Sequence, residues 1–170
     1  QGQGGRQVRT SKEHGEIYDH HMIEFTYEDG TKMLSQCRHI RNTWNSVSEH
    51  IHGTKGTSDV GGARILDTDG ALVWEYGRGG GNGHQQEHHD LFAALRRGVA
   101  LNEASYAALS TMTAILGRMA TYSGQFVAWD EAIASPEPLV DVDRLSSCSD
   151  PPPVRPDAHG RYPVAVPGIS

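Results

Sequence analysis

The chain has 170 residues, of which 36% are apolar and 21% are charged, and its net charge is −6. This length fits one or two domains, and a chain of this size buries about 68–70% of its unfolded surface when it folds. The acidic balance argues against nonspecific nucleic-acid binding, which needs a basic footprint. No apolar run approaches the roughly 20 residues of a membrane span.

Three features of the composition bear on origin and compartment. The first residue is Gln1 rather than a methionine, so we expect the chain to be a piece of a longer protein. The two cysteines, Cys37 and Cys148, do not form a disulfide scaffold, and they slightly favour the cytoplasm over the periplasm. Ten residues are histidine, which directs attention to metal and ligand sites.

The N-terminal quarter of the chain predicts a loop followed by a β-hairpin. Residues 1–14 are polar and Gly-rich, which is typical of a loop. Residues 17–28 and 31–40 alternate between apolar and polar side chains, and Asp29-Gly30 lies between them. An Asp-Gly pair in this position is a strong signal for a hairpin with a two-residue type I′ turn.

A two-residue turn would fix the register of this hairpin, pairing Glu28 with Thr31 and His20 with His39. One face would then point to the core and carry His21, Ile23, Phe25, Tyr27, Leu34 and Ile40. The opposite face would carry His20, Met22, Glu24, Ser35, Cys37 and His39. A slip of one residue would exchange the faces, so this prediction depends on the turn.

More strands and a loop are predicted over the next forty residues. Residues 46–52 resemble a third strand, closed by the segment Gly53-Thr-Lys-Gly56. Residues 63–67 and 71–76 flank Thr68-Asp69-Gly70 and predict a second hairpin. The Gly-rich residues 77–83 predict a flexible loop.

The C-terminal half changes to helical periodicity and then to a Pro-rich tail. An apolar stripe predicts a helix over 84–98, and Asn102 and Gly124 bound a second, longer helix over 103–123 that is apolar enough to be mostly buried. Residues 136–170 predict an extended tail that packs along a partner surface or stays mobile. The fold class is therefore α+β: an open, mostly antiparallel mixed sheet with two helices on one face.

One motif in the first helix suggests a metal site. The segment His84-Gln-Gln-Glu87-His88 matches H-x-x-E-H, in which two histidines one helical turn apart bind zinc and the glutamate acts as general base. A small metal-dependent hydrolase is therefore one alternative function. Zinc needs a third protein ligand, and no downstream helix offers an obvious one, so the preferred interpretation is that His88 lies on the inner stripe of the helix.

The glycine-rich segments do not match a nucleotide site. Neither Gly77 nor Gly79 begins a G-x-G-x-x-G pattern, so residues 77–83 are not a dinucleotide loop. In the segment Gly53–Thr57, Lys55 precedes the second glycine, which does not fit a Walker A motif. This segment is either a tight turn between strands or a turn whose Lys55 contacts a ligand hydroxyl or phosphate.

Polar and aromatic side chains on the predicted strands suggest a site for a polyhydroxylated ligand. The polar and aromatic side chains in question are His20, Glu24, Cys37, Arg38, His39, Trp44 and His52. Planar donors suit hydroxyl groups, and an aromatic face suits a sugar ring. No nucleophile–base–orienter triad is evident, because Ser35 and Cys37 lack an elbow motif.

The second half of the chain resembles a known family. Residues 85–135 read QQEHHDLFAALRRGVALNEASYAALSTMTAILGRMATYSGQFVAWDEAIAS, and the upstream segments DHHMIEFTYEDG, SQCRHI and SEHIHGTKGT extend the similarity over about residues 5–136. These segments are similar to the C-terminal part of bacterial Gfo/Idh/MocA-type oxidoreductases. The stretch STMTAILGRMATYSG resembles a bacterial subgroup of that family.

The resemblance implies a substrate-binding and oligomerisation domain over residues 15–135. Family members bind NAD or NADP in an N-terminal Rossmann domain and act on a sugar or polyol hydroxyl, and their open sheet often forms a homo-oligomer interface. The family's nucleotide loop, catalytic lysine motif and acid–histidine pair have no match here, so no catalytic residue is carried over and this chain alone would not transfer hydride. We expect six substrate-facing residues: Arg38, His39, Trp44, His52, Lys55 and His88. A non-enzymatic sugar-binding or dimerisation module is the other alternative.

Overall fold

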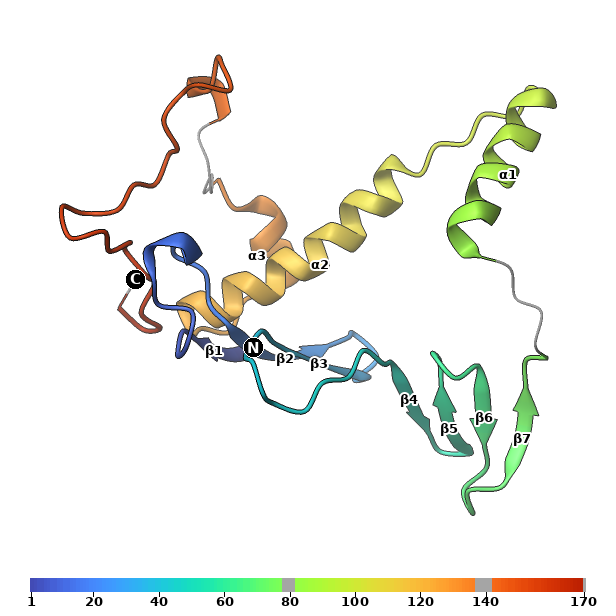
Figure 1. Cartoon of the computed structure of the whole chain (residues 1–170). Coiled ribbons are helices and arrows are strands. Elements are labelled where there is room, and N and C mark those ends of the chain that lie inside the picture. Colours follow the sequence, from blue (N-terminus) through green and yellow to red (C-terminus); the bar gives the residue numbers. More distant parts are fainter. Residues whose placement is uncertain (78–81, 137–141, 170) are drawn as a thin grey trace. The chain divides into compact units, whose positions relative to one another are not determined.

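The computed structural model describes residues 1–77, 82–136 and 142–169 (Figure 1). These residues form two antiparallel sheets and three α-helices, which confirms the predicted α+β class. The chain divides into two compact units, one comprising Gln1–Asn42 with Ala104–Ser170 and the other Thr43–Glu103. The domain predicted over residues 15–135 stays a prediction. The division into compact units does not test which segments of the chain fold independently.

The first unit contains a three-stranded sheet with the order β1-β2-β3. The strands are β1 at Gly2–Gly5, β2 at His20–Thr26 and β3 at Lys32–Arg38. Strand β1 lies where the sequence predicts a loop, and a short 3-10 turn, η1 at Lys12–His14, follows it.

The glycines of β1 explain why its sequence is not typical of a strand. A Cβ added at Gly2 would lie 2.8 Å from Cγ2 of Thr121, and one added at Gly4 would lie 2.9 Å from the carbonyl oxygen of His20. Close approach of neighbouring segments therefore requires glycine, although glycine is normally depleted in strands.

The hairpin between β2 and β3 is confirmed, but its predicted register is wrong by one residue. The loop contains three residues, Glu28 to Gly30, because Tyr27 donates its N–H to the carbonyl of Thr31. Gly30 has a φ of 83°, the left-handed residue that such a three-residue loop needs. His20 consequently pairs with Arg38 and not with His39.

The corrected register changes which side chains of β3 face the core. His21, Ile23 and Phe25 of β2 do lie on the half-buried face, as predicted. On β3, however, Met33 shares this face, whereas Leu34 lies on the opposite face with 62% of its surface exposed. Cys37 likewise pairs with His21 and not with a residue of the open face.

Helix α2 at Ala104–Ser123 covers one face of this sheet with its C-terminal half. Gly117 faces β2, where an added Cβ would lie 3.0 Å from Cζ of Phe25. The N-terminal half is exposed, with Tyr106 at 75%, so the expectation that the whole helix is mostly buried is wrong there. Helix α3 at Trp129–Ala134 packs on α2.

The C-terminal segment returns to the first unit. After a 3-10 turn, η2 at Val142–Arg144, the described residues have no regular structure up to residue 169. The carbonyl of Ala165 accepts a hydrogen bond from the Tyr18 hydroxyl at 2.9 Å, and Gly168 donates its N–H to Ser123. The predicted extended tail therefore packs at its end against its own unit.

The second unit contains a four-stranded sheet with the order β4-β5-β6-β7. The strands are β4 at His50–Gly53, β5 at Gly56–Asp59, β6 at Arg64–Leu66 and β7 at Leu72–Glu75. The predicted hairpin of 63–67 and 71–76 corresponds to β6 and β7. Strand β5 was not predicted from the sequence, and the predicted third strand begins only at residue 50.

Helix α1 at Gly83–Arg96 completes the second unit. Asn82 caps it by accepting the N–H of His84, and Gly98 follows with a φ of 69°. Among the described residues, no helix packs on the β4–β7 sheet. No helix of the described part of the chain is long and apolar enough to cross a bilayer.

Gly56 is a position where the fold of the second sheet can be tested. Its φ is 149°, and an added Cβ would lie 2.1 Å from the carbonyl oxygen of Leu66. Gly56→Ala should therefore break the β5–β6 pairing and cost about 2–4 kcal/mol of stability. Amide hydrogen exchange in β5 and β6 measures the effect. Gly53→Ala is the matched control, since its Cβ would lie at an ordinary 3.6 Å from Gly56; equal protection in both variants would contradict the expectation.

Candidate functional site

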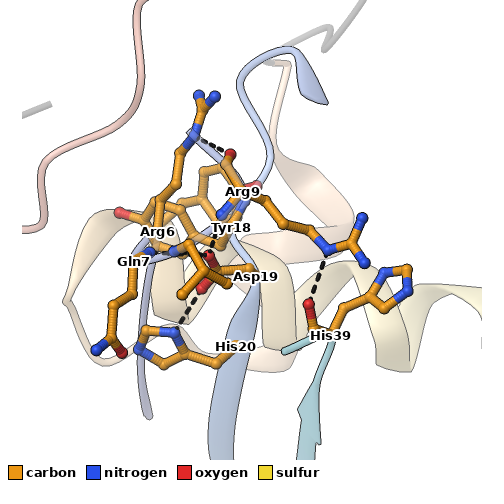
Figure 2. Close-up of polar contacts among 9 residues, drawn as sticks. Arg6, Gln7, Arg9, Tyr18, Asp19, His20 and His39 are labelled. Atoms are coloured by element: carbon orange, nitrogen blue, oxygen red, sulfur yellow. Dashed lines mark hydrogen bonds and ion pairs between the residues drawn. The ribbon is translucent and has the colours of Figure 1, made fainter. Parts of the chain in front are cut away.

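A buried carboxylate lies directly before β2 in the first sheet. Asp19, immediately before β2, is 2% exposed. Its Oδ2 atom accepts the backbone N–H groups of Gln7, Val8 and Arg9 at 2.8, 2.7 and 2.9 Å (Figure 2). The loop after β1 thus folds around the carboxylate, and its three amides compensate the buried charge.

The second oxygen of this carboxylate orients a histidine. Oδ1 of Asp19 lies 2.8 Å from Nδ1 of His20, whose side chain is 40% exposed. An ionised carboxylate only accepts hydrogen bonds, so Nδ1 must carry the proton. In the neutral ring, Nε2 is then an acceptor, and among the described residues it has no hydrogen-bond partner. Figure 2 shows this ring on the opposite side of Asp19 from the pair formed by Arg9 and His39.

Backbone hydrogen bonds connect Asp19 to the last residue of β1 and to His39, which follows β3. Asp19 donates its N–H to the carbonyl of Gly5 and accepts the N–H of His39 at 2.8 Å. The carbonyl of His39 accepts Nε of Arg9 at 2.7 Å (Figure 2). Side chain and main chain together hold Asp19 at the point where all three strands end or begin.

An aromatic layer between β2 and α2 supports this arrangement. The rings of Tyr18 and Tyr122 stack with centroids 4.1 Å apart, and the Arg118 guanidinium lies 4.3 Å from the Tyr122 centroid. The Tyr122 hydroxyl accepts the N–H of Tyr18 at 2.9 Å. Beside them, Nδ1 of His21 lies 2.9 Å from Oγ1 of the fully buried Thr121.

The environment of Asp19 shifts its acidity. Burial acts to raise the pKa of this carboxyl, but the amide hydrogen bonds from Arg9, Val8 and Gln7 and the contact with His20 outweigh it. The pKa therefore lies well below its ordinary value.

His21 shows the opposite case on the inner face. Burial lowers the pKa of its imidazole, and the nearby charges of His20 and Arg118 lower it further, against the opposing effect of Asp19. His20 and His21 are adjacent in β2 but point to opposite faces, so one ring is available to a ligand and the other belongs to the core.

The open face of the sheet, opposite α2, is mainly polar. His20 lies between Gly5 of β1 and Arg38 of β3 in the register. The next row places Met22 between Gln3 and Gln36. Further along, Glu24 accepts Nζ of Lys32 at 2.7 Å. The face therefore presents an imidazole, a guanidinium, two amides and the Glu24–Lys32 ion pair, together with the exposed apolar side chains of Met22 and Leu34.

The six predicted substrate-facing residues are divided between the two compact units. Arg38 and His39 belong to the first unit, and Arg38 pairs with His20. The other four belong to the second unit and are exposed: Trp44, His52, Lys55 and His88. Lys55 occupies the two-residue turn that joins β4 and β5, which confirms that Gly53–Gly56 is a turn between strands.

The H-x-x-E-H segment forms the first turns of α1. Glu87 Oε1 lies 3.9 Å from Nδ1 of His84 and 3.7 Å from Nδ1 of His88. Nδ1 of His88 lies 2.6 Å from the carbonyl oxygen of His84. Within residues 1–77, 82–136 and 142–169, no group of three or more histidine, cysteine or acidic side chains could hold a metal ion. His88 is exposed, so its predicted place on an inner stripe is wrong.

The central role of Asp19 was not predicted from the sequence. The sequence pattern predicts His20 on the open face of the sheet, but with His39 instead of Arg38 as its cross-strand partner. One signal in the sequence could have indicated the pair of Asp19 and His20: an acidic residue directly before a histidine at the start of a strand. The backbone before a strand is irregular, so the acidic side chain can fold back toward the residue that follows it. The glycine-rich loop that supplies the amides has no comparable signal.

Comparison of the chain with protein-family models, with curated proteins and with solved structures finds no match.

Removing the charge of Asp19 should destabilise the first unit. Asp19→Asn places an amide where three N–H groups need an acceptor, and we expect a loss of about 2–3 kcal/mol. Because the folded-state pKa lies below the unfolded value of about 4, the carboxylate stabilises the wild type above that pH and less as the pH falls. Urea unfolding at several pH values measures both effects. Asp29→Asn, in an exposed turn, is the control; equal losses in the two variants would refute the assignment.

His21 should make stability fall on acidification from neutral pH. Its folded-state pKa lies below the unfolded value of about 6.5, so the unfolded chain binds a proton first and stability is lost as the pH falls below that value. His21→Gln should flatten this part of the profile of Tm against pH, while His14→Gln, on an exposed turn, should retain it. Thermal unfolding followed by circular dichroism tests this, and an unchanged slope in His21→Gln would count against it.

Proposed function

We propose that the chain is the substrate-binding and oligomerisation domain of an NAD(P)-dependent oxidoreductase that acts on a sugar or polyol hydroxyl. NAD or NADP would be bound by a separate Rossmann domain, and this chain alone would not transfer hydride. The resemblance of residues 85–135 to Gfo/Idh/MocA-type proteins supports the enzyme class. The proposed substrate-facing residues are Arg38, His39, Trp44, His52, Lys55 and His88.

The observation that carries the oligomerisation role is the two-faced character of the β4–β7 sheet. Pairing places Ile51, Ser58, Ile65 and Trp74 in one row across all four strands. The ring of Tyr76 lies 6.3 Å from that of Trp74. This face, the apolar face, carries no charge among these residues, and Ile51, Ile65 and Trp74 are 61%, 42% and 48% exposed.

The opposite face of the same sheet has a different chemistry. Its parallel row contains His50, Asp59, Arg64 and Glu75, with an ion pair of 3.3 Å between Arg64 and Asp59. Charged side chains suit water, whereas an apolar patch of this kind is typical of an interaction surface. A second copy of the chain is the occupant we propose, because two uncharged apolar faces stack at the ordinary spacing of about 10 Å without repulsion.

A charge on the apolar face should prevent association. The wild-type chain should sediment as a concentration-dependent dimer, and Trp74→Lys and Ile65→Lys should each sediment as monomers, because a buried lysine has no partner there. Glu75→Gln, on the charged face, should associate like the wild type. Sedimentation velocity measures the association, and circular dichroism checks that each variant is folded.

Two outcomes would contradict the proposal. A wild type that stays monomeric at millimolar concentration would remove the oligomerisation role. Saturable binding of NADH by the chain alone, followed by nucleotide fluorescence, would contradict the assignment of the cofactor to a separate domain.

A further inference from the structure

We propose that the open face of the β1–β3 sheet binds a small hydroxycarboxylate, with Nε2 of His20 accepting the ligand hydroxyl and the guanidinium of Arg38 pairing with its carboxylate. This deepens the proposed function, on which it rests, by naming the ligand class and the two groups that meet it. Both of these groups belong to the first unit.

The first step concerns the acceptor. The ionised Asp19 holds the proton on Nδ1 of His20 at 2.8 Å, so the neutral ring exposes Nε2 as a lone-pair acceptor. The carboxylate itself is anchored by three amides and cannot turn away without losing them. The imidazole is therefore held in one tautomer and one orientation, which lowers the entropic cost of binding a hydroxyl group.

The Nε2 atom of His20 also has space beside it on the β1 side. Gly5 is the cross-strand neighbour of His20 on β1. A Cβ at this position would lie 3.3 Å from Nε2 and 3.2 Å from Cε1 of His20. Because Gly5 has no side chain, the acceptor atom stays accessible above the β1 strand.

The register places Arg38 on the strand opposite Gly5, so His20 lies between these two residues. The N–H of Tyr27 bonds to Thr31, so odd-numbered residues of β2 form the hydrogen-bonded pairs with β3. His20 and Arg38 therefore form a non-hydrogen-bonded pair, whose Cβ atoms lie about 4.5–5.5 Å apart. Arg38 is exposed, and its five donors allow a carboxylate to bind in addition to other contacts.

These two groups together select the ligand class. An imidazole acceptor alone would take any hydroxyl, and a guanidinium alone would take any anion. Their adjacency favours a molecule that carries a hydroxyl within a few bonds of a carboxylate. In the next row Gln3 and Gln36 flank Met22, and their amides offer hydrogen bonds to further hydroxyl groups of a longer chain.

Nitrogen-detected NMR of the histidine rings tests the proposal on the full chain. In its neutral form, the His20 ring should carry its proton on Nδ1 and leave Nε2 unprotonated. Gluconate should shift the His20 signals saturably, whereas glucitol and acetate, which each lack one of the two groups, should bind at least about tenfold more weakly. The signal of His14, on the exposed turn η1, serves as an internal reference.

Variants separate the two contacts. His20→Gln and Arg38→Gln should each weaken gluconate binding at least about tenfold, followed by the shifts of the remaining strand amides, and His14→Gln should bind like the wild type. Equal affinity for gluconate and acetate, equal affinity for gluconate and glucitol, an absent His20 shift, or unchanged binding by either variant would overturn the proposal. A chain that dimerises through the apolar face but does not bind gluconate would refute this inference and leave the proposed oligomerisation role standing.

Discussion

The capture of three backbone amides by one buried carboxylate is the interaction on which the first unit depends. Asp19 accepts N–H groups from residues 7 to 9, so the loop after β1 has to close around it. Its own backbone bonds connect it to Gly5 on one side and His39 on the other. A carboxylate buried without these donors would be strongly unfavourable, so the loop and the three-stranded sheet stabilise each other.

The same constraint determines what the two following histidines do. Once Asp19 precedes the first residue of β2, strand alternation sends His20 to the open face and His21 to the face covered by α2. Oδ1 of Asp19 contacts Nδ1 of His20, and Oγ1 of Thr121 lies 2.9 Å from Nδ1 of His21. Two identical side chains therefore acquire different properties: one is oriented at the surface, and the pKa of the other is lowered by burial.

Sequence patterns predicted most elements because those elements follow local rules. The hairpins around Gly30 and Gly70 and the helix end at Gly124 all rest on residues whose backbone preferences are intrinsic. The register of the first hairpin was harder to predict, because an Asp-Gly pair fits both a two-residue and a three-residue loop. A difference of one residue moves Leu34 from the core face to the open face.

Features that depend on contacts distant in sequence were not predictable in this way. Strand β1 exists because Gly2 and Gly4 allow close approach to Thr121 and His20, and no local propensity encodes such neighbours. The Asp19 site joins a carboxylate to amides about ten residues away, which only the folded loop reveals. For helix α2, composition predicted burial along its whole length, but only its C-terminal half meets a sheet.

The chemistry of the two sheets suggests a division of roles between the units. The open face of β1–β3 is polar and carries an oriented acceptor, which suits a small ligand that water also solvates. The apolar face of β4–β7 has a row of uncharged side chains with Trp74 at one end, which suits a surface removed from water. A sheet face without charged groups gains from a partner of the same kind, while a face with His20 and Arg38 would lose hydration if a second sheet covered it. This difference in side-chain polarity supports the proposed association through the second unit and the proposed ligand binding at the first.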